Sequence, residues 1–253
     1  MPSKVVEGII LQVKPYGEAD LIIDFFSSQW GRMRGIAKGA KKSKKRFVNC
    51  LEPLHWVRLS LFEKQNNSLV RIDQGELINP FPGIRKDYKK LGQASYFCEM
   101  IKELFAIGDT NRPVFELIRE SLQALDQGKG DQEIFDIFQV RLLKIAGYAL
   151  YLTSCLGCGK RAETIFDPVF SLSQGGIFCP KCLIGEKGIP LSPGTVHCLR
   201  QAGSLAFPQV FHIRFSRNMR EEIGQLLHSF SCRIMGKELG SSRYLRQLQE
   251  PYG

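Results

Sequence analysis

Short apolar-rich runs follow one another through residues 1–80, with basic and apolar residues partly alternating in residues 30–36, and this pattern indicates β-strands. Turn-forming residues separate the runs, as in Pro15-Tyr16-Gly17-Glu18 and Asn66-Asn67. The predicted strands cover residues 5–11, 21–26, 30–36, 54–62 and 69–72. Five short strands with glycine-rich corners predict a small closed barrel of the OB-fold type, with a small open sandwich as the alternative.

The period of the apolar positions becomes helical after a proline-containing linker at residues 79–83. Pro113 suits the first turn of a helix, and Asp131 is a plausible cap for another that is apolar on most faces. The predicted helices cover residues 84–105, 113–125, 134–147, a segment that starts at Ser192-Pro193, and an amphipathic segment at 218–235. The second part of the chain is therefore expected to be helical.

Four cysteines carry the clearest chemical signal, as Cys155-Leu-Gly-Cys158 and Cys179-Pro-Lys-Cys182. Two C-x-x-C turns at this separation match the spacing of a four-thiolate zinc site. Four protein ligands leave no position for water or substrate, so one structural Zn²⁺ is predicted and a catalytic metal is not. Two redox-active dithiols, or scattered structural thiols, are the alternative.

These patterns together predict an α+β multidomain protein. The expected parts are an OB-fold at residues 1–80, a helical domain that begins at 81–150, a zinc module at 151–186 and the rest of the helical domain at 187–253. Because the last helices have no other obvious partner, we interpret the zinc module as an insertion into one all-α domain.

The net charge of the chain limits the kinds of partner that it is expected to bind. The chain carries a net charge of +10 at pH 7, which favours a polyanion, with nucleic acid as the leading candidate. An anionic membrane lacks the support of a basic amphipathic helix, and simple solubility is the remaining explanation. No apolar run approaches the roughly 20 residues of a membrane span, and no signal-peptide pattern starts the chain. We therefore expect a cytoplasmic protein in which Cys50, Cys98, Cys198 and Cys232 are buried thiols.

One segment concentrates the positive charge, and no acidic residue interrupts the sequence between Asp24 and Glu52. Small residues space the basic ones, which predicts a flexible cationic loop for the phosphate backbone, with salt-dependent and sequence-tolerant affinity. Its basic residues are Arg32, Arg34, Lys38, Lys41, Lys42, Lys44, Lys45 and Arg46. Trp30 and Phe47 border the loop and either stack on unpaired bases or belong to the barrel core. The alternative for the loop is a solvated segment without a partner.

Catalytic signatures are missing from the sequence. It contains no phosphate-binding GxxxxGK[ST] loop, no dinucleotide fingerprint and no H-E-x-x-H pair, and its histidines are scattered. We therefore expect no enzymatic activity and no small-molecule substrate. Two rival classes of protein remain. One is an RNA- or ribosome-associated protein with an OB barrel and a zinc ribbon. The other is a zinc-dependent nuclease, but the closed cysteine site argues against this class.

The order of several motifs resembles the RecO family of bacterial DNA-repair and recombination mediators. The resemblance covers most of the chain and rests on four features. These are the strand Glu7-Gly8-Ile9-Ile10-Leu11 followed by Tyr16-Gly17-Glu18-Ala19-Asp20-Leu21, the basic stretch from Gly31 to Lys42, the cysteine turns, and the closing Ser241-Ser242-Arg243-Tyr244-Leu245.

The resemblance implies an OB-fold and a helical domain with an inserted zinc module. It also implies binding to single- and double-stranded DNA, annealing of complementary strands, and cooperation with RecR in placing RecA on DNA coated by single-strand-binding protein. Contact with the acidic C-terminal tail of single-strand-binding protein implies a basic, apolar groove in the helical domain, for which Arg141 and Lys144 are candidates. The protein would then be associated with the nucleoid.

Overall fold

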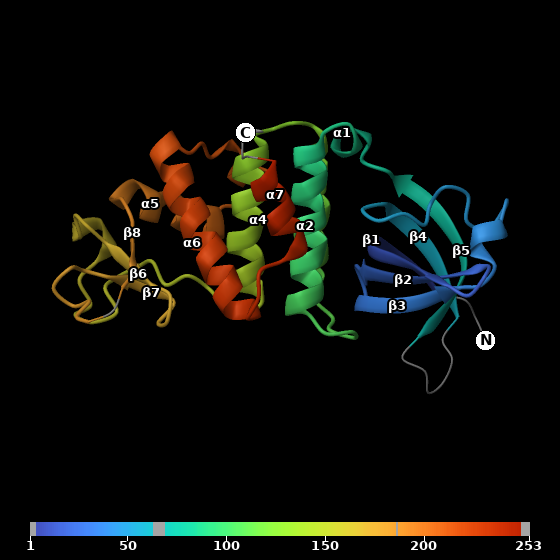
Figure 1. Cartoon of the computed structure of the whole chain (residues 1–253), viewed down its shortest axis with the longest axis horizontal. Coiled ribbons are helices and arrows are strands. Elements are labelled where there is room, and N and C mark those ends of the chain that lie inside the picture. Colours follow the sequence, from blue (N-terminus) through green and yellow to red (C-terminus); the bar gives the residue numbers. More distant parts are fainter. Residues whose placement is uncertain (1–3, 63–68, 186, 249–253) are drawn as a thin grey trace. The chain divides into compact units, whose positions relative to one another are not determined.

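The computed structural model describes residues 4–62, 69–185 and 187–248 of the 253-residue chain. Backbone contacts divide these residues into two compact units, 4–127 with 240–248, and 128–239. The chain therefore leaves the first unit after residue 127 and returns to it with its last helix (Figure 1). No helix in the described ranges combines the length and the apolar character needed to cross a membrane.

Five strands of the first unit close into a barrel with the order β1-β2-β3-β5-β4 (Figure 1). They are β1 (Lys4–Tyr16), β2 (Asp20–Ser27), β3 (Gly31–Ala37), β4 (Trp56–Phe62) and β5 (Val70–Asn79). Strand β1 pairs antiparallel with β2 and with β4, while β3 pairs parallel with β5. The predicted closed, OB-like barrel is confirmed and the open sandwich is wrong. The predicted Asn66-Asn67 turn lies outside the described residues.

Alternation explains the barrel core. In β4, Val57, Leu59 and Leu61 are buried, whereas the intervening positions reach the surface. These side chains join Ile23 and Phe25 of β2 in one apolar cluster. At the parallel pairing of β3 and β5, a Cβ on Gly35 would lie 2.7 Å from Ile72 Cγ1, so glycine allows the two strands to close the barrel.

The first unit also contains α1 (Pro82–Arg85), α2 (Tyr88–Leu104), α3 (Arg112–Asp126) and α7 (Gly240–Gln247). Asp87 caps α2 by accepting from the amides of Lys89 and Lys90, and Pro113 lies in the first turn of α3, as predicted. The segment predicted as a linker forms one helical turn instead. Its Gly83 amide donates to Asp126 Oδ1 at 2.6 Å, which fixes that turn to the end of α3.

The described residues of the second unit form three α-helices, two short 3₁₀ helices and a small sheet. The α-helices are α4 (Asp131–Ile145), α5 (Pro193–Ser204) and α6 (Arg217–Met235), and the sheet has the order β7-β6-β8, formed by β6 (Val169–Ser171), β7 (Gly176–Phe178) and β8 (Ile189–Pro190). Ser192 caps α5 as predicted, since its hydroxyl accepts from the Thr195 amide. The cap of α4 differs from the prediction because Gly130, at φ 89°, precedes the helix and Asp131 is its first residue. We call residues 151–190 the cysteine module; the predicted four-part division of the chain remains a prediction.

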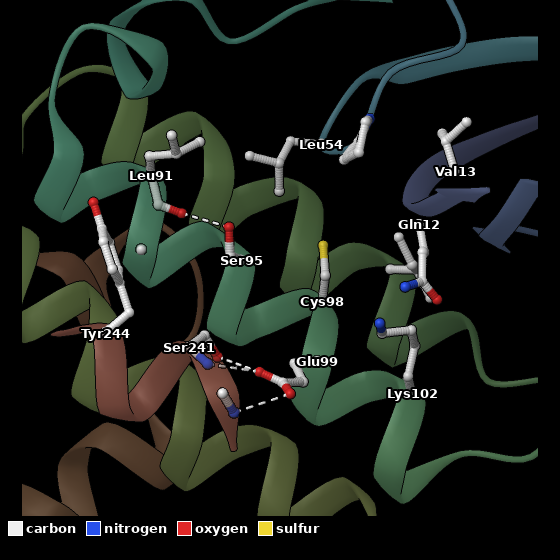
Figure 2. Close-up of a pocket in the computed structure, with 14 residues that line it drawn as sticks. Gln12, Val13, Leu54, Leu91, Ser95, Cys98, Glu99, Lys102, Ser241 and Tyr244 are labelled. Atoms are coloured by element: carbon white, nitrogen blue, oxygen red, sulfur yellow. Dashed lines mark hydrogen bonds between the residues drawn. The ribbon is translucent and has the colours of Figure 1, made fainter. Parts of the chain in front are cut away.

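The closing helix α7 docks on α2 through Glu99 and Gly92. Glu99 accepts hydrogen bonds from the amides of Gly240 (3.1 Å) and Ser241 (3.0 Å) and from the Ser241 hydroxyl (Figure 2). A carboxylate at a helix N-terminus satisfies amides that have no partner within the helix. A Cβ on Gly92 would lie 2.7 Å from Leu245 Cδ2, so a larger residue there would require the side chains of α7 to shift. The C-terminal Ser241-to-Leu245 motif is therefore a docking motif within the first unit.

Glu99→Gln is expected to weaken the docking of α7 by about 1–2 kcal/mol at pH 7, because it removes a charged hydrogen-bond acceptor. Desolvation alone would raise the pKa of Glu99, but its bonds to Ser241 and Gly240 lower it overall. A lowered folded-state pKa contributes stability above the ordinary glutamate pKa, and that stability is lost as pH falls through the lowered value. Thermal unfolding should therefore show the full wild-type advantage at pH 7, and this advantage should shrink as pH falls below the ordinary glutamate pKa and through the lowered value.

The matched control for this substitution is Glu116→Gln. Glu116 forms an exposed pair with Arg112 at 2.8 Å, so its loss should change the free energy of unfolding by less than about 0.5 kcal/mol. Equal effects of the two substitutions would contradict the docking role of Glu99.

Candidate metal centre and nucleic-acid interface

Two tight backbone turns present the four cysteine sulfurs. In the first turn, the Gly159 amide donates to the Cys155 carbonyl at 2.9 Å; in the second, the Cys182 amide donates to the Cys179 carbonyl at 3.0 Å. The turns approach each other so closely that a Cβ on Gly157 would lie 2.7 Å from Cys182 Cβ. Two chain segments are thus folded around one point.

The four Sγ atoms lie within 4.8 Å of one another, and those of Cys158 and Cys179 are 3.8 Å apart. Tetrahedral coordination with metal–sulfur bonds of about 2.3 Å requires sulfur–sulfur distances of about 3.8 Å. All four predicted ligands are therefore brought together with a geometry that fits a four-thiolate metal site. Each offers one sulfur, so a bound metal would be enclosed by protein ligands.

Hydrogen bonds distribute the protons unevenly over this cluster. Burial raises the pKa of Cys155, but the backbone amides of Cys179, Cys158 and Gly157 outweigh it and lower the value to about 6. The Cys179 amide lies 3.3 Å from Cys155 Sγ. Hydrogen bonds with Cys179 and Cys158, followed by burial, raise the pKa of Cys182 to about 12. Metal binding at neutral pH therefore has to displace a proton from Cys182, so affinity falls as pH falls.

The other four cysteines are free thiols outside this cluster. Cys50 and Cys98 are buried, as predicted, and burial raises their pKa values to about 11 and about 12. Cys198 and Cys232 are only partly buried, which differs from the prediction. The high pKa values of Cys50 and Cys98 make both thiols poor nucleophiles.

The basic segment is anchored to the barrel instead of forming the flexible loop that the sequence suggested. Residues Ala40–Lys42 form a 3₁₀ turn. The Lys41 amide donates to the Ala19 carbonyl at 3.0 Å, and the Gly39 amide donates to Asp20 Oδ1 at 2.7 Å. Ala19 lies in the turn between β1 and β2, and Asp20 is the first residue of β2, so the cationic segment has a fixed position beside that turn.

The lysines of this segment are exposed. Lys41 donates to the Gly17 carbonyl at 2.9 Å. The side chains that have no partner among the described residues are those of Lys38, Lys42, Lys44 and Lys45. A hollow of about 470 Å³ opens beside them and is lined in part by Lys41, Lys44 and Val48. The structure therefore gathers four free ammonium groups along one edge of the barrel.

Arg32 and Arg34 have a different environment, because strand pairing places Asp24 directly opposite Arg34 and diagonal to Arg32, whose direct partner is Phe26. Asp24 is only 4% exposed and lies 3.0 Å from the guanidinium of each. Arg32 is 11% exposed and also donates to the carbonyls of Lys102 and Phe105. Arg32 therefore links β3 to the end of α2, whereas the side chain of Arg34 remains partly exposed. Sequence reasoning missed this partner because the two strands had no assigned register.

Arg46 and the two flanking aromatic residues also make internal contacts. Arg46 donates to the Lys38 carbonyl at 2.7 Å and lies over the Phe47 ring. Phe47 belongs to the barrel core, so of the two roles considered for it, base stacking and core packing, the structure supports core packing. Trp30 is partly buried against the same core, with Lys4 Nζ 4.9 Å from its ring centroid. Phe47 is therefore a packing residue, and Trp30 presents only part of its ring.

The fold and the site define a class of protein in which an OB-like barrel with a cationic edge precedes a helical region that carries a four-cysteine cluster. Two family models match the chain, "Recombination protein O N terminal" over residues 1–81 and "Recombination protein O C terminal" over residues 85–243. The chain belongs to the RecO family. The predicted family assignment and fold class are confirmed.

Curated relatives agree over nearly the full length. A "DNA repair protein RecO" of Syntrophus aciditrophicus is 33% identical and covers 96% of this chain and 95% of its own length. Proteins with the same name from Syntrophobacter fumaroxidans and Thermoanaerobacter sp. are each 30% identical, with 98% and 96% of this chain covered and 98% and 97% of the relatives. The similarity therefore spans the barrel, the helices and the cysteine module.

Proposed function

We propose that this chain is a DNA-repair and recombination mediator that binds single- and double-stranded DNA and anneals complementary strands. Its family membership supports a role in DNA repair, since the curated relatives are named DNA repair proteins. The observation that carries the proposal is the barrel edge with the free ammonium groups of Lys38, Lys42, Lys44 and Lys45. We propose that the chain acts by binding alone, without catalysing a reaction and without a small-molecule substrate.

Annealing requires two polyanions to approach each other while their bases stay available. Lysine side chains neutralise phosphates and release condensed counterions without reading base edges. The anchored 3₁₀ turn fixes the main-chain positions of the lysines. Their long, flexible side chains can then contact the phosphate backbone of DNA of any sequence. Arg34 and Arg46 can add to this surface, while the contacts of Arg32 make it a support for β3.

One structural Zn²⁺ is the metal we propose for the cysteine cluster. Soft thiolates in a tetrahedral arrangement suit zinc, and a closed four-ligand site supplies folding energy. Cys155, Cys158, Cys179 and Cys182 would hold it. The ion would tie the two turns of the module together and would take no part in DNA chemistry.

A groove in the second unit suits the acidic tail of single-strand-binding protein. It has a volume of about 300 Å³, an apolar lining that includes Val140, Leu152 and Leu199, and the cations Lys144 and Arg200 at its edge. Lys144 donates to the Gly203 carbonyl at 2.9 Å and remains exposed. Arg141 donates to the carbonyls of Ala202 and Leu205 and lies over Phe207, so it holds the end of α5 in place. We propose Lys144 as the main tail contact, because Arg200 is already paired with Glu163. We further propose RecR as a direct partner and RecA as an indirect one, in the cytoplasm at the nucleoid.

The proposal is tested by annealing two complementary oligonucleotides, each coated with the cognate single-strand-binding protein, with and without this chain. We expect acceleration that disappears at high salt, because the contacts are to phosphates. Lys144→Glu should remove the acceleration on coated strands and preserve it on bare strands. Failure of the wild-type chain to accelerate either reaction would contradict the proposal.

RNA of the same length and sequence separates the proposal from its rival. A clear preference for RNA over DNA would favour an RNA- or ribosome-associated role. Metal-dependent cleavage of either nucleic acid would contradict the absence of enzymatic activity. Equal or stronger binding to DNA, without cleavage, is the expected result.

A further inference from the structure

A second hollow of the second unit combines exposed aromatic rings with a free cation. It has a volume of about 500 Å³ and lies where the chain after α4, the β6–β7 hairpin and α6 meet. Its lining includes Tyr148, Tyr151, Leu156, Phe230 and Arg233. Neither the cationic edge of the barrel nor the groove at Lys144 includes these side chains.

Large apolar side chains are exposed at its rim. Tyr148 is 46% exposed, Tyr151 is 43% exposed and Leu156 is 39% exposed. Phe230, by contrast, is buried and packs edge-on against Phe170 with ring centroids 5.5 Å apart. Exposed rings around a firm apolar base form a surface on which a flat apolar ligand can stack.

The backbone holds the two tyrosines in place. The Tyr151 amide donates to the Gly175 carbonyl at 2.9 Å, and the Ile177 amide donates to the Tyr151 carbonyl at 3.0 Å. The Tyr148 amide donates to the Leu143 carbonyl at 2.8 Å, which ties it to the end of α4. A ring on a fixed backbone loses little conformational entropy on binding, so the rim is preorganised for its ligand.

The charge of the hollow favours an anionic ligand. Arg233 is exposed, and among the described residues it has no hydrogen-bond or ion-pair partner. Its neighbours in α6 differ, since Arg220 pairs with Glu133 and Arg217 pairs with Glu221. No aspartate or glutamate lines the hollow in the part of the chain that the structure describes. An unpaired guanidinium without a nearby carboxylate is available for a phosphate.

We propose that this hollow binds unpaired nucleobases of single-stranded DNA, with Tyr148 and Tyr151 as stacking surfaces and Arg233 as the contact to the neighbouring phosphate. The inference rests on the proposed function, which it deepens by adding a second, base-dependent site to the phosphate-dependent barrel edge. Bases in a duplex are already stacked and offer no free face, so the hollow discriminates single strands from duplexes. A mediator with both sites holds a single strand more tightly than a duplex with the same phosphates.

Three ligands separate base contacts from phosphate contacts: a single-stranded oligonucleotide, an abasic strand of the same length, and the corresponding duplex. Their affinities are measured with the full zinc-loaded chain and with Tyr148→Ala, Tyr148→Phe and Arg233→Gln. Tyr148→Ala should weaken single-strand binding about 5-fold or more and leave the abasic strand and the duplex unchanged. Tyr148→Phe keeps the ring and should bind like wild type. Arg233→Gln should weaken both the normal and the abasic single strand.

The possible outcomes are distinct. Unchanged single-strand affinity in Tyr148→Ala would overturn the base-stacking site, and so would an equal loss of affinity for normal and abasic strands. If the wild-type chain still anneals strands, the proposed function stands in either case. A wild-type chain that binds no DNA would overturn both. Unchanged DNA binding in Tyr148→Ala together with lost binding of a protein partner would make the hollow a peptide site and overturn the inference. Zinc content and far-ultraviolet circular dichroism establish whether each variant is folded. If the alanine variant is not, Arg233→Gln, at an exposed position, decides, since unchanged affinity of this variant for both single strands would overturn the inference.

Discussion

Cys155→Ser is expected to release the metal and to unfold the cysteine module at residues 151–190. Serine is a poor zinc ligand at neutral pH, and a structural four-thiolate zinc contributes an apparent binding free energy of about 10–16 kcal/mol. Cys155 is also the sulfur that accepts the amide of Cys179, so its loss removes a contact between the two turns. We expect zinc content far below one ion per chain, lower solubility, and rapid proteolysis within the module. Cys182→Ser should behave in the same way.

Cys198→Ser is the matched control for this prediction. Cys198 is a partly buried thiol of α5 outside the cluster, so its replacement should leave zinc content at one ion per chain and shift the melting temperature only slightly. Wild-type chain treated with a chelator should resemble Cys155→Ser. Stoichiometric zinc and an unchanged melting curve in Cys155→Ser would refute the structural role of the metal.

Replacing Lys38, Lys42, Lys44 and Lys45 together by glutamine is expected to remove most of the DNA affinity. Each side chain is exposed, has no partner among the described residues, and can neutralise one phosphate. Loss of four phosphate contacts should reduce the magnitude of the slope of log Kobs against log salt by about 3 to 4. Fluorescence anisotropy across a series of salt concentrations measures both the affinity and the slope. Folding should be unaffected because the anchoring amides of Gly39 and Lys41 remain.

A control with the same change in net charge distinguishes position from total charge. Lys14, Lys86, Lys89 and Lys129 are exposed lysines outside the basic segment, and their replacement by glutamine also lowers the net charge by four. We expect this variant to keep most of the affinity and most of the salt slope. Equal losses in the two variants would mean that net charge alone attracts DNA and that the barrel edge is no site.

The barrel and the cysteine cluster were predictable because both depend on short-range patterns. Alternation in β4 specifies which face is buried, and the two C-x-x-C turns supply two thiols each. The cap at Ser192 was predictable for the same reason, since a cap involves residues only three positions apart.

Interactions between distant segments were not predictable. Asp24 neutralises Arg32 and Arg34 only because of the register between β2 and β3, and that register follows from the closed barrel. The hollow at Tyr148 and Arg233 joins residues from α6 and the start of the cysteine module. The signal in the sequence was the pair Tyr148 and Tyr151 just after α4, which ends at Ile145, because large apolar residues outside a helix are less expected to belong to the core.

The return of the last helix to the first unit has a consequence for synthesis of the protein. The face of α2 that carries Gly92 and Glu99 is finished early, but its cover, residues 240–247, leaves the ribosome only after residues 128–239. At 5–20 residues per second this delay is about ten seconds. During that time a partly apolar face of α2 remains exposed to solvent in the nascent chain. In a chain that ends before Gly240, this face stays exposed. Residues near the C-terminus thus complete the part of the chain that is made first, so removal of α7 is expected to leave the first unit incomplete.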